Sequence, residues 1–254
     1  MKFYIFASGS KGNCTLISSN GKTLIIDMGI THKNFLEKLE NTPFKFDDIN
    51  AYLFTHDHND HIGGVCKKIN KEYCYCALGT LDIPLKNELI HYETYEINGF
   101  KITVLPTSHD AKNPIGFVID DGNEKLVYMT DTGYISTKNF EYMRNANHYI
   151  IESNYNYKML MQTSRPESLK LRIVGDCGHL SNEESAATIC QLIGDKTQNI
   201  CLAHISQEAN TKELALETYR NIFRKYDVSL ENINLFTADQ YETVIFGEEV
   251  VYEN

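Results

Sequence analysis

The stretch Thr55-His56-Asp57-His58-Asn59-Asp60-His61 constrains this chain more than any other segment. It places three of the nine histidines, together with two carboxylates, within six positions. The apolar run at residues 51–54 before it predicts a short buried strand. The cluster is therefore expected on a loop at the end of a strand, where α/β proteins commonly place their functional sites.

The spacing inside this stretch is typical of metal ligands. Side chains two apart in an extended segment point the same way, so we expect His56 and His58 to reach one metal ion together. Asp60 and His61 follow a bend and can place their side chains at a second position nearby. Imidazole and carboxylate ligands without thiolates suit Zn²⁺, Mn²⁺ or Fe²⁺. A polar turn that contains histidines by chance is the alternative, and four metal-capable side chains in six residues disfavour it.

Bulk composition places the chain among globular proteins. Its 254 residues allow one large domain or two small ones, and 42% of them are hydrophobic. It has no apolar run of about 18 residues, so we expect no membrane-spanning helix and no contact with a membrane. The N-terminal segment turns polar too early for a signal peptide. Seven cysteines without zinc-ribbon spacing favour reduced thiols and a cytoplasmic location.

The charge balance bears on the substrate. The formal net charge is −10, and the chain has no basic cluster of five or more residues. Proteins that bind long nucleic acids usually do so along a basic track. The charge therefore weighs mildly against extended DNA or RNA, but it is compatible with a small phosphorylated ligand held at metal ions.

Strand-like and helix-like segments alternate from end to end, without a linker or a low-complexity run. We therefore expect a single domain over residues 1–254 with two β layers covered by helices. Asn20-Gly21 and Asn98-Gly99 are typical of hairpin turns. The expected strands lie at 3–8, 14–18, 23–27, 51–55, 73–78, 91–97, 100–106, 115–120, 125–130, 148–152, 199–204, 233–237 and 243–247. The expected helices lie at 31–40, 62–71, 183–194 and 212–226, and the stretch 155–172 is the least regular.

Further metal-capable side chains repeat the pattern of the first cluster. His109, Asp131 and His204 each follow shortly after an expected strand, and His179 precedes an expected helix. A single histidine after a strand usually only satisfies a nearby backbone group. The repetition, added to the cluster at 56–61, favours one shared site.

The chain resembles the metallo-β-lactamase superfamily, whose signature motif matches His56-x-His58-x-Asp60-His61. The resemblance implies an α/β fold, the αββα sandwich, with two divalent metal ions. We expect zinc, with manganese as the alternative. The implied ligands are His56, His58 and His109 for the first ion, Asp60, His61 and His204 for the second, and Asp131 between the two.

Within the superfamily, the chain is similar to the YycJ/WalJ group from about residue 6 to residue 215. This group is related to RNase Z and to phage anti-Pycsar phosphodiesterases. Two departures lie in the stretch 155–172: Tyr155-Asn156 replaces a His-Asp, and Ser164-Arg165-Pro166-Glu167 replaces a Tyr-Pro-Trp element. The motifs that carry the similarity are Ala7–Asn13, Asp131–Gly133, Glu152–Asn154 and Gly178–Asn182.

The expected catalytic residues are Asp60, His179 and Glu152. Asp60 would orient the nucleophile, His179 would protonate the leaving oxygen or grip the phosphate, and Glu152 would orient His179. A helix cap for His179 and an ordinary strand-end acid for Glu152 are the alternatives. Expected substrate contacts are Ser10, Asn13, His179 and Arg165, with Lys11 as a further phosphate partner, although Ser10 and Asn13 are equally suited to forming a turn.

We therefore predict a metal-dependent phosphodiesterase that acts on nucleotides. The acidic charge and the altered stretch 155–172 narrowly favour a small 3′,5′-cyclic nucleotide. Closeness to the YycJ/WalJ group favours a 5′→3′ DNA exonuclease. A thioester or lactam hydrolase is disfavoured by the motifs at Glu152 and His179, and a non-catalytic, metal-stabilised nucleotide-binding protein is the remaining alternative. A homodimer that exchanges the loop 155–172 is also expected.

Overall fold

The computed structural model describes residues 1–248, and its chain forms two compact units. The first unit comprises residues 1–104, 111–115 and the segment from Asp239 on. The second comprises residues 105–110 and 116–238. Among the described residues, no helix has both the length and the apolar character needed to cross a membrane. The expectation of a single domain over 1–254 stays a prediction, and its last six residues lie outside the described part.

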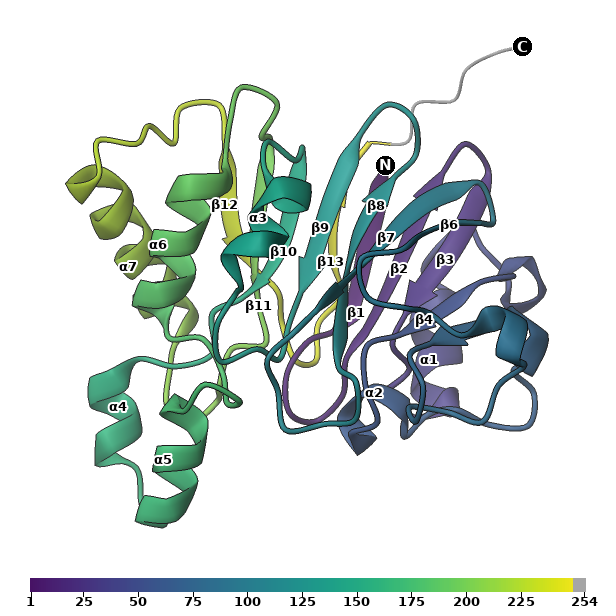
Figure 1. The fold of residues 1–254 in the computed structure, drawn as a ribbon, viewed down its shortest axis with the longest axis horizontal. Coiled ribbons are helices and arrows are strands. Elements are labelled where there is room, and N and C mark those ends of the chain that lie inside the picture. Colours follow the sequence, from purple (N-terminus) through teal and green to yellow (C-terminus); the bar gives the residue numbers. More distant parts are fainter. Residues whose placement is uncertain (249–254) are drawn as a thin grey trace. The chain divides into compact units, whose positions relative to one another are not determined.

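The first unit is built on a six-stranded sheet in the order β13-β1-β2-β3-β4-β5 (Figure 1). Its first four strands in this order pair antiparallel, and β3, β4 and β5 pair parallel. The hairpin of β6 and β7 also begins in this unit. The strand bounds are β1 (Lys2–Ala7), β2 (Cys14–Ser19), β3 (Lys22–Ile26), β4 (Tyr52–Phe54), β5 (Cys74–Cys76), β6 (Thr94–Ile97), β7 (Phe100–Pro106) and β13 (Val244–Gly247).

Both predicted hairpin turns are confirmed. Asn20 and Gly21 have φ angles of 51° and 70°, and Asn98 and Gly99 have φ angles of 49° and 83°. Two consecutive residues in the left-handed region form the turn that matches the twist of paired strands. The sequence pattern thus predicts the antiparallel β opening of this unit correctly.

Helix α1 (His32–Leu39) buries Phe35 and Leu39 in the core of the first unit. The hydroxyl of Thr31 accepts a hydrogen bond from the backbone N–H of Asn34 at 3.2 Å and so caps the helix. Phe6 packs edge-on against Phe35, with 5.8 Å between the ring centroids. The helix expected at 31–40 is confirmed.

The helix expected at 62–71 is wrong. Helix α2 spans only Asn59–Ile62, and the next helical turn is the 3₁₀ segment Lys71–Tyr73. The N–H of Gly64 donates to the carbonyl of Met28 at 2.7 Å, and a Cβ at Gly64 would lie 1.8 Å from the carbonyl oxygen of Ile30. The chain therefore leaves the helix to pack against a distant backbone segment, which local propensity cannot reveal.

The second unit holds strands in the order β12-β11-β10-β9-β8. The four strands from β9 to β12 are parallel, and β8 runs antiparallel to β9. Helices α6 and α7 lie side by side next to β11 and β12 (Figure 1). The bounds are β8 (Ile115–Asp120), β9 (Lys125–Met129), β10 (His148–Glu152), β11 (Asn199–Ala203), β12 (Asn234–Thr237), α3 (Thr137–Met143), α4 (Tyr157–Gln162), α5 (Glu167–Val174), α6 (Asn182–Leu192) and α7 (Lys212–Lys225).

The structure differs from the sequence-based predictions at several segments. The stretch 155–172 is not irregular, because α4 and most of α5 lie in it. Leu160 and Ile173 from these helices pack with Tyr155 and Ala209, and such packing stabilises helices that are too short to form alone. Helix α3 was not expected, and the strands expected at 73–78 and 91–97 are shortened to β5 and β6.

Candidate metal centre

In the first unit, the three histidines of the motif lie together at the end of β4. The ring centroids of His56 and His58 are 4.7 Å apart, and those of His56 and His61 are 4.0 Å apart. The turn of α2 brings His61 back, because its N–H donates to the carbonyl of His58 at 2.9 Å. An oxygen of Asp60 lies 3.6 Å from Nε2 of His61. The four ligands predicted in this unit are thus neighbours.

A buried carboxylate that the sequence analysis did not single out supports this group. Asp27 follows β3 directly, is fully buried, and has a φ angle of 59°. Its Oδ2 lies 2.7 Å from Nδ1 of His61, and its Oδ1 accepts from the N–H of Thr55 at 2.8 Å. The hydroxyl of Thr55 donates to the same carboxylate and lies 3.0 Å from Nδ1 of His56. The available signal was a carboxylate directly after an apolar strand, the pattern that points to Asp131.

Of the residues expected from the first turn, Asn13 reaches the histidines. Its amide nitrogen Nδ2 donates to Nε2 of His61 at 3.0 Å, and its Oδ1 accepts from the N–H of Gly9 at 2.8 Å. Ser10 is exposed in the same turn, and the ammonium of Lys11 donates to the hydroxyl of Tyr241 at 2.8 Å. Asn13 therefore shapes the turn and contacts a predicted ligand at once.

In the second unit, the predicted residues gather at the carboxyl ends of the parallel strands β9, β10 and β11. Asp131 and His204 follow β9 and β11 with φ angles of 54° and 53°. The amide nitrogen Nδ2 of Asn154 donates to the carbonyl of His204 at 2.8 Å and supports this conformation. Non-glycine residues in the left-handed region are uncommon and tend to occur at functional sites, where the surroundings hold them in place.

The carboxylate of Glu152 holds two of these imidazoles. Its Oε1 lies 2.9 Å from Nδ1 of His179 and 2.8 Å from Nδ1 of His204. Its Oε2 accepts from the backbone N–H groups of Thr132 at 3.0 Å and Leu180 at 3.1 Å. Burial opposes the charged form, but the charge of His179 and the hydrogen bonds from His179 and His204 outweigh it and hold the pKa of Glu152 well below its usual range.

His109 and Asp131 complete the set in this unit. Nδ1 of His109 donates to the carbonyl of Gly178 at 3.0 Å, and its Nε2 lies 3.8 Å from an oxygen of Asp131. The same oxygen of Asp131 is 3.4 Å from Nδ1 of His204 and 3.6 Å from Nδ1 of His179. Burial lowers the pKa of His109, which favours the neutral imidazole that binds metal ions.

The donors in both units suit divalent metal ions. His109 and His204 each have Nδ1 engaged by a carboxylate or a carbonyl, so Nε2 is the ring nitrogen suited to a metal ion. Metal-binding histidines almost always have this second partner. Nδ1 of His61 is engaged by Asp27 in the same way, and its Nε2 would have to exchange the hydrogen bond from Asn13 for the metal ion. Asp131, Glu152, His179 and His204 offer ligand atoms within 4.8 Å of one another. Because Glu152 already accepts four hydrogen bonds, we assign it to positioning the imidazoles rather than to the metal.

His179 differs from its neighbours in exposure. Its side chain is 19% exposed, whereas those of His109 and His204 are 2% exposed. The imidazole of His179 can therefore contact a substrate. Arg165, the other expected contact in this unit, is paired with Glu208 at 2.9 Å instead.

The chain is similar to one protein family and to several named proteins. A family model described as a β-lactamase superfamily domain matches residues 23–205. The chain is 34% identical over 243 residues to exodeoxyribonuclease WalJ of Streptococcus pneumoniae, covering 90% of each chain. It is 32% identical over 228 residues to exodeoxyribonuclease YycJ of Bacillus anthracis, covering 85% and 86%. It is 28% identical over 157 residues to anti-Pycsar protein Apyc1 of Paenibacillus harenae, covering 50% of this chain and 63% of that one.

The fold is found among solved structures as well. The crystal structure of the metallo-β-lactamase fold protein YhfI from Bacillus subtilis matches with a TM-score of 0.69 at 14% identity. The match covers 96% of this chain and 99% of that one. The α/β metallo-β-lactamase fold expected from the motif is thereby confirmed.

Proposed function

Since the chain belongs to the β-lactamase superfamily, we propose that it is a metal-dependent exodeoxyribonuclease that shortens DNA from the 5′ end. It is a metal-dependent hydrolase of this superfamily. The observation that carries the proposal is the pair of imidazoles on Glu152, of which His204 is buried and suited to a metal ion and His179 is partly exposed to solvent. The similarity to two proteins named exodeoxyribonucleases supports DNA as the substrate.

We propose that the histidine sets of the two units hold two metal ions, zinc in the first place and manganese as the alternative. When bound, such ions lower the pKa of a water molecule and neutralise charge on the reacting phosphate. The proposed ligands are His56, His58 and His109 for one ion, Asp60, His61 and His204 for the other, and Asp131 for both.

The remaining steps belong to side chains of this protein. The hydrogen bond from Nδ1 of His179 to Glu152 fixes the ring, so that Nε2 faces the substrate. From there, His179 donates a proton to the leaving oxygen or grips the phosphate. Asp60 orients the attacking water. Glu152 acts as a positioning residue, because its four hydrogen bonds leave it buried and away from the substrate.

We favour DNA over a cyclic nucleotide as the substrate. This reverses the narrow preference for a cyclic nucleotide that rested on the net charge and on the stretch 155–172. Net charge counts the whole surface, whereas a DNA end needs only a local basic contact beside the metal ions. The two exodeoxyribonucleases match this chain over most of its length. A 3′,5′-cyclic nucleotide is the second candidate, favoured by the match of half of this chain to the anti-Pycsar protein.

Product analysis tests this choice directly. The metal-loaded protein is incubated in parallel with 5′-phosphorylated DNA and with 3′,5′-cyclic mononucleotides, and the His179→Ala variant serves as the control. We expect stepwise shortening of the DNA from its 5′ end, and we expect the variant to be impaired. Ring opening of a cyclic nucleotide with intact DNA would favour the second candidate. Hydrolysis of neither substrate, nor of bis-p-nitrophenyl phosphate, would point to a non-catalytic nucleotide-binding protein.

We also propose a homodimer in which residues 155–172, which hold α4 and most of α5, reach the partner copy. Tyr157 and Leu171 on these helices are 55% and 60% exposed, which suits a contact surface. Light scattering at micromolar concentration tests this, and a monomer would refute it.

A cytoplasmic location is consistent with the seven free cysteines, because reduced thiols are the rule there.

A further inference from the structure

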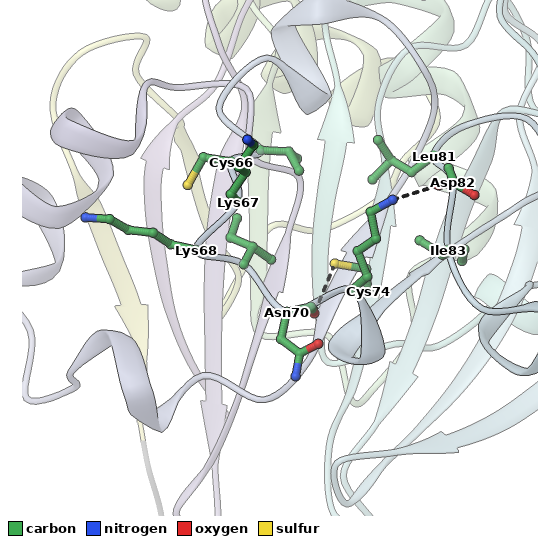
Figure 2. A pocket seen from close by; sticks show the side chains of 11 residues that line it. Cys66, Lys67, Lys68, Asn70, Cys74, Leu81, Asp82 and Ile83 are labelled. Carbon is green, nitrogen blue, oxygen red and sulfur yellow. Dashed lines mark hydrogen bonds and ion pairs between the residues drawn. The ribbon is translucent and has the colours of Figure 1, made fainter.

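A pocket in the first unit follows the metal-binding motif directly in the chain. It has a volume of about 850 Å³ and is lined by residues 65–71, Cys74 and residues 81–83. Figure 2 shows Cys66, Lys67 and Lys68 on one side and Leu81, Asp82 and Ile83 on the other. We name it the lysine pocket after Lys67, Lys68 and Lys71. Its volume lies in the range of pockets that hold small organic ligands.

The lysine pocket combines an apolar lining with positive charge. Val65, Ile69, Leu81 and Ile83 supply apolar side chains, of which Ile69 is buried. The ammonium of Lys71 is paired with Asp82 at 2.7 Å. Within residues 1–248, Lys67 and Lys68 are exposed and form no ion pair. Two positive charges thus remain available to an anion beside an apolar surface.

The stretch of chain that includes residues 81–83 of the lysine pocket also exposes apolar side chains. Large exposed side chains gather between residues 73 and 90 of the same unit, with exposed fractions from 39% to 84%. They are Tyr73, Leu78, Leu85 and Ile90. Proteins that bind single-stranded nucleic acid combine aromatic side chains, on which bases stack, with a positively charged groove that follows the phosphates. Tyr73 is the aromatic member of this set, and the other three side chains add apolar surface.

The lysine pocket is tied to the metal-binding motif by a short piece of chain. Four residues span at most about 14 Å, so the Cα atom of Val65 lies within about 14 Å of that of His61. At about 3.4 Å per nucleotide along a stacked strand, this distance corresponds to roughly four nucleotides. The close approach of Gly64 to the carbonyls of Met28 and Ile30 holds the connection against the segment that follows β3. The pocket therefore lies within reach of a strand whose end is at the motif.

We propose that the lysine pocket binds a nucleotide of single-stranded DNA a few positions from the end being cleaved, with the base against Leu81 and Ile83 and the phosphates at Lys67 and Lys68. This inference rests on the proposed nuclease function and deepens it. It assigns strand binding to residues outside the metal-binding set. It also explains how a chain with a net charge of −10 can hold DNA, since the positive charge is local.

The test measures binding rather than cleavage. The metal-loaded protein is titrated against a 3′-labelled, 5′-phosphorylated oligothymidylate with phosphorothioate linkages, which resist hydrolysis, and fluorescence anisotropy is followed between about 50 and 200 mM salt. For the double variant Lys67→Gln/Lys68→Gln we expect a Kd raised about tenfold at low salt. The slope of log K against log salt should fall by about 1.4, because each phosphate contact on a single strand contributes about 0.7.

Two further variants separate the contributions. Arg224→Gln/Lys225→Gln removes the same charge from α7 and should leave the Kd and the slope unchanged. Leu81→Gln should weaken binding about threefold without changing the salt slope, because it removes apolar contact with a base. Hydrolysis of bis-p-nitrophenyl phosphate should stay at the wild-type rate in all three variants, since none of these residues belongs to the metal-binding set.

The outcomes distinguish the pocket from the proposed function. Equal Kd values and slopes for the lysine variant and the wild type would overturn the role of the pocket, even if the protein degrades DNA. An equal effect of the variant on α7 would do the same. If the wild type binds DNA through Lys67 and Lys68 but does not shorten an ordinary oligonucleotide, the pocket stands and the nuclease function fails.

Discussion

The two histidine sets differ in how the chain assembles them. In the first unit, one local motif supplies four predicted ligands, and Asp27 holds a single imidazole, that of His61. In the second unit, the residues come from separate strand ends along the chain, and Glu152 holds two imidazoles with different exposure. Under the proposed function, the first set would serve metal binding alone, whereas the second would join metal binding to substrate contact through one shared carboxylate.

The largest expected effect separates the two imidazoles on Glu152. We predict that His204→Asn loses about one equivalent of metal together with at least about a thousandfold in rate, because a ligand is removed. His179→Asn should keep its metal and lose about a hundredfold to ten-thousandfold in rate, the usual contribution of a proton donor. Metal content by plasma mass spectrometry and initial rates on DNA give both values. Asparagine is used because it tolerates the left-handed backbone of His204. Equal metal loss in both variants would contradict the division of roles.

A smaller effect should distinguish the two carboxylates. Replacing a group that orients a metal-binding histidine typically lowers metal affinity or activity about 10- to 100-fold. We predict that Glu152→Gln lowers the rate by an amount near the upper end of this range, since it disturbs both His179 and His204. Asp27→Asn should lie near the lower end and should raise the metal concentration needed for half-maximal rate. A larger loss of kcat for Asp27→Asn than for Glu152→Gln would reverse the comparison.

Two glycines provide a matched test of the backbone in each unit. A Cβ at Gly29 would lie 1.6 Å from the carbonyl oxygen of Asp60, and one at Gly133 would lie 2.2 Å from that of Asp176. Each Gly→Ala substitution should cost about 2 kcal/mol of unfolding free energy, because the backbone must move. Urea denaturation measures this cost. Gly29→Ala should also weaken metal binding more than Gly133→Ala, since it displaces a predicted ligand. Unchanged metal affinity in Gly29→Ala would contradict the proposed role of Asp60.

The smallest expected effect concerns pH and stability in the metal-free protein. The pKa of Glu152 is lower in the folded protein than its usual value of 4.5. Its charged form therefore stabilises the fold above about pH 4.5, and this contribution is lost as the pH falls below that value. We predict that the advantage of the wild type over Glu152→Gln shrinks by about 1–2 kcal/mol on acidification from about pH 6 to pH 3. If the unfolding free energies of the two proteins change equally with pH, the charge of Glu152 makes no pH-dependent contribution to stability.

The local features of the fold and site were predictable from the sequence. The spacing of the motif at 56–61 predicts a cluster that needs only one turn of α2 to form, and the Asn-Gly pairs predict two hairpins. His109, Asp131 and His204 became candidates because each follows a strand. For Asp131 and His204, the parallel order of β9, β10 and β11 explains why the strand ends lie together.

The features that escaped prediction depend on contacts between distant segments. Asp27 is a single carboxylate after a strand, and its role depends on Thr55 and His61 lying beside it. The helix expected at 62–71 fails because Gly64 packs against a backbone segment more than thirty residues earlier. Helices α4 and α5 form because Leu160 and Ile173 find partners elsewhere in the second unit. None of these contacts leaves a periodic signal in the local sequence.

The most direct test of a two-metal reaction is a metal titration of DNA degradation. Metal-free protein receives zinc or manganese in increasing amounts, and release of nucleotides from 5′-phosphorylated DNA is measured at each step. We predict negligible activity without metal and a rise that ends at two equivalents per chain, with both His61→Ala and His204→Asn failing to reach that plateau. Full activity at one equivalent, or activity that survives loss of either histidine, would contradict the proposal that the reaction needs both histidine sets and two metal ions.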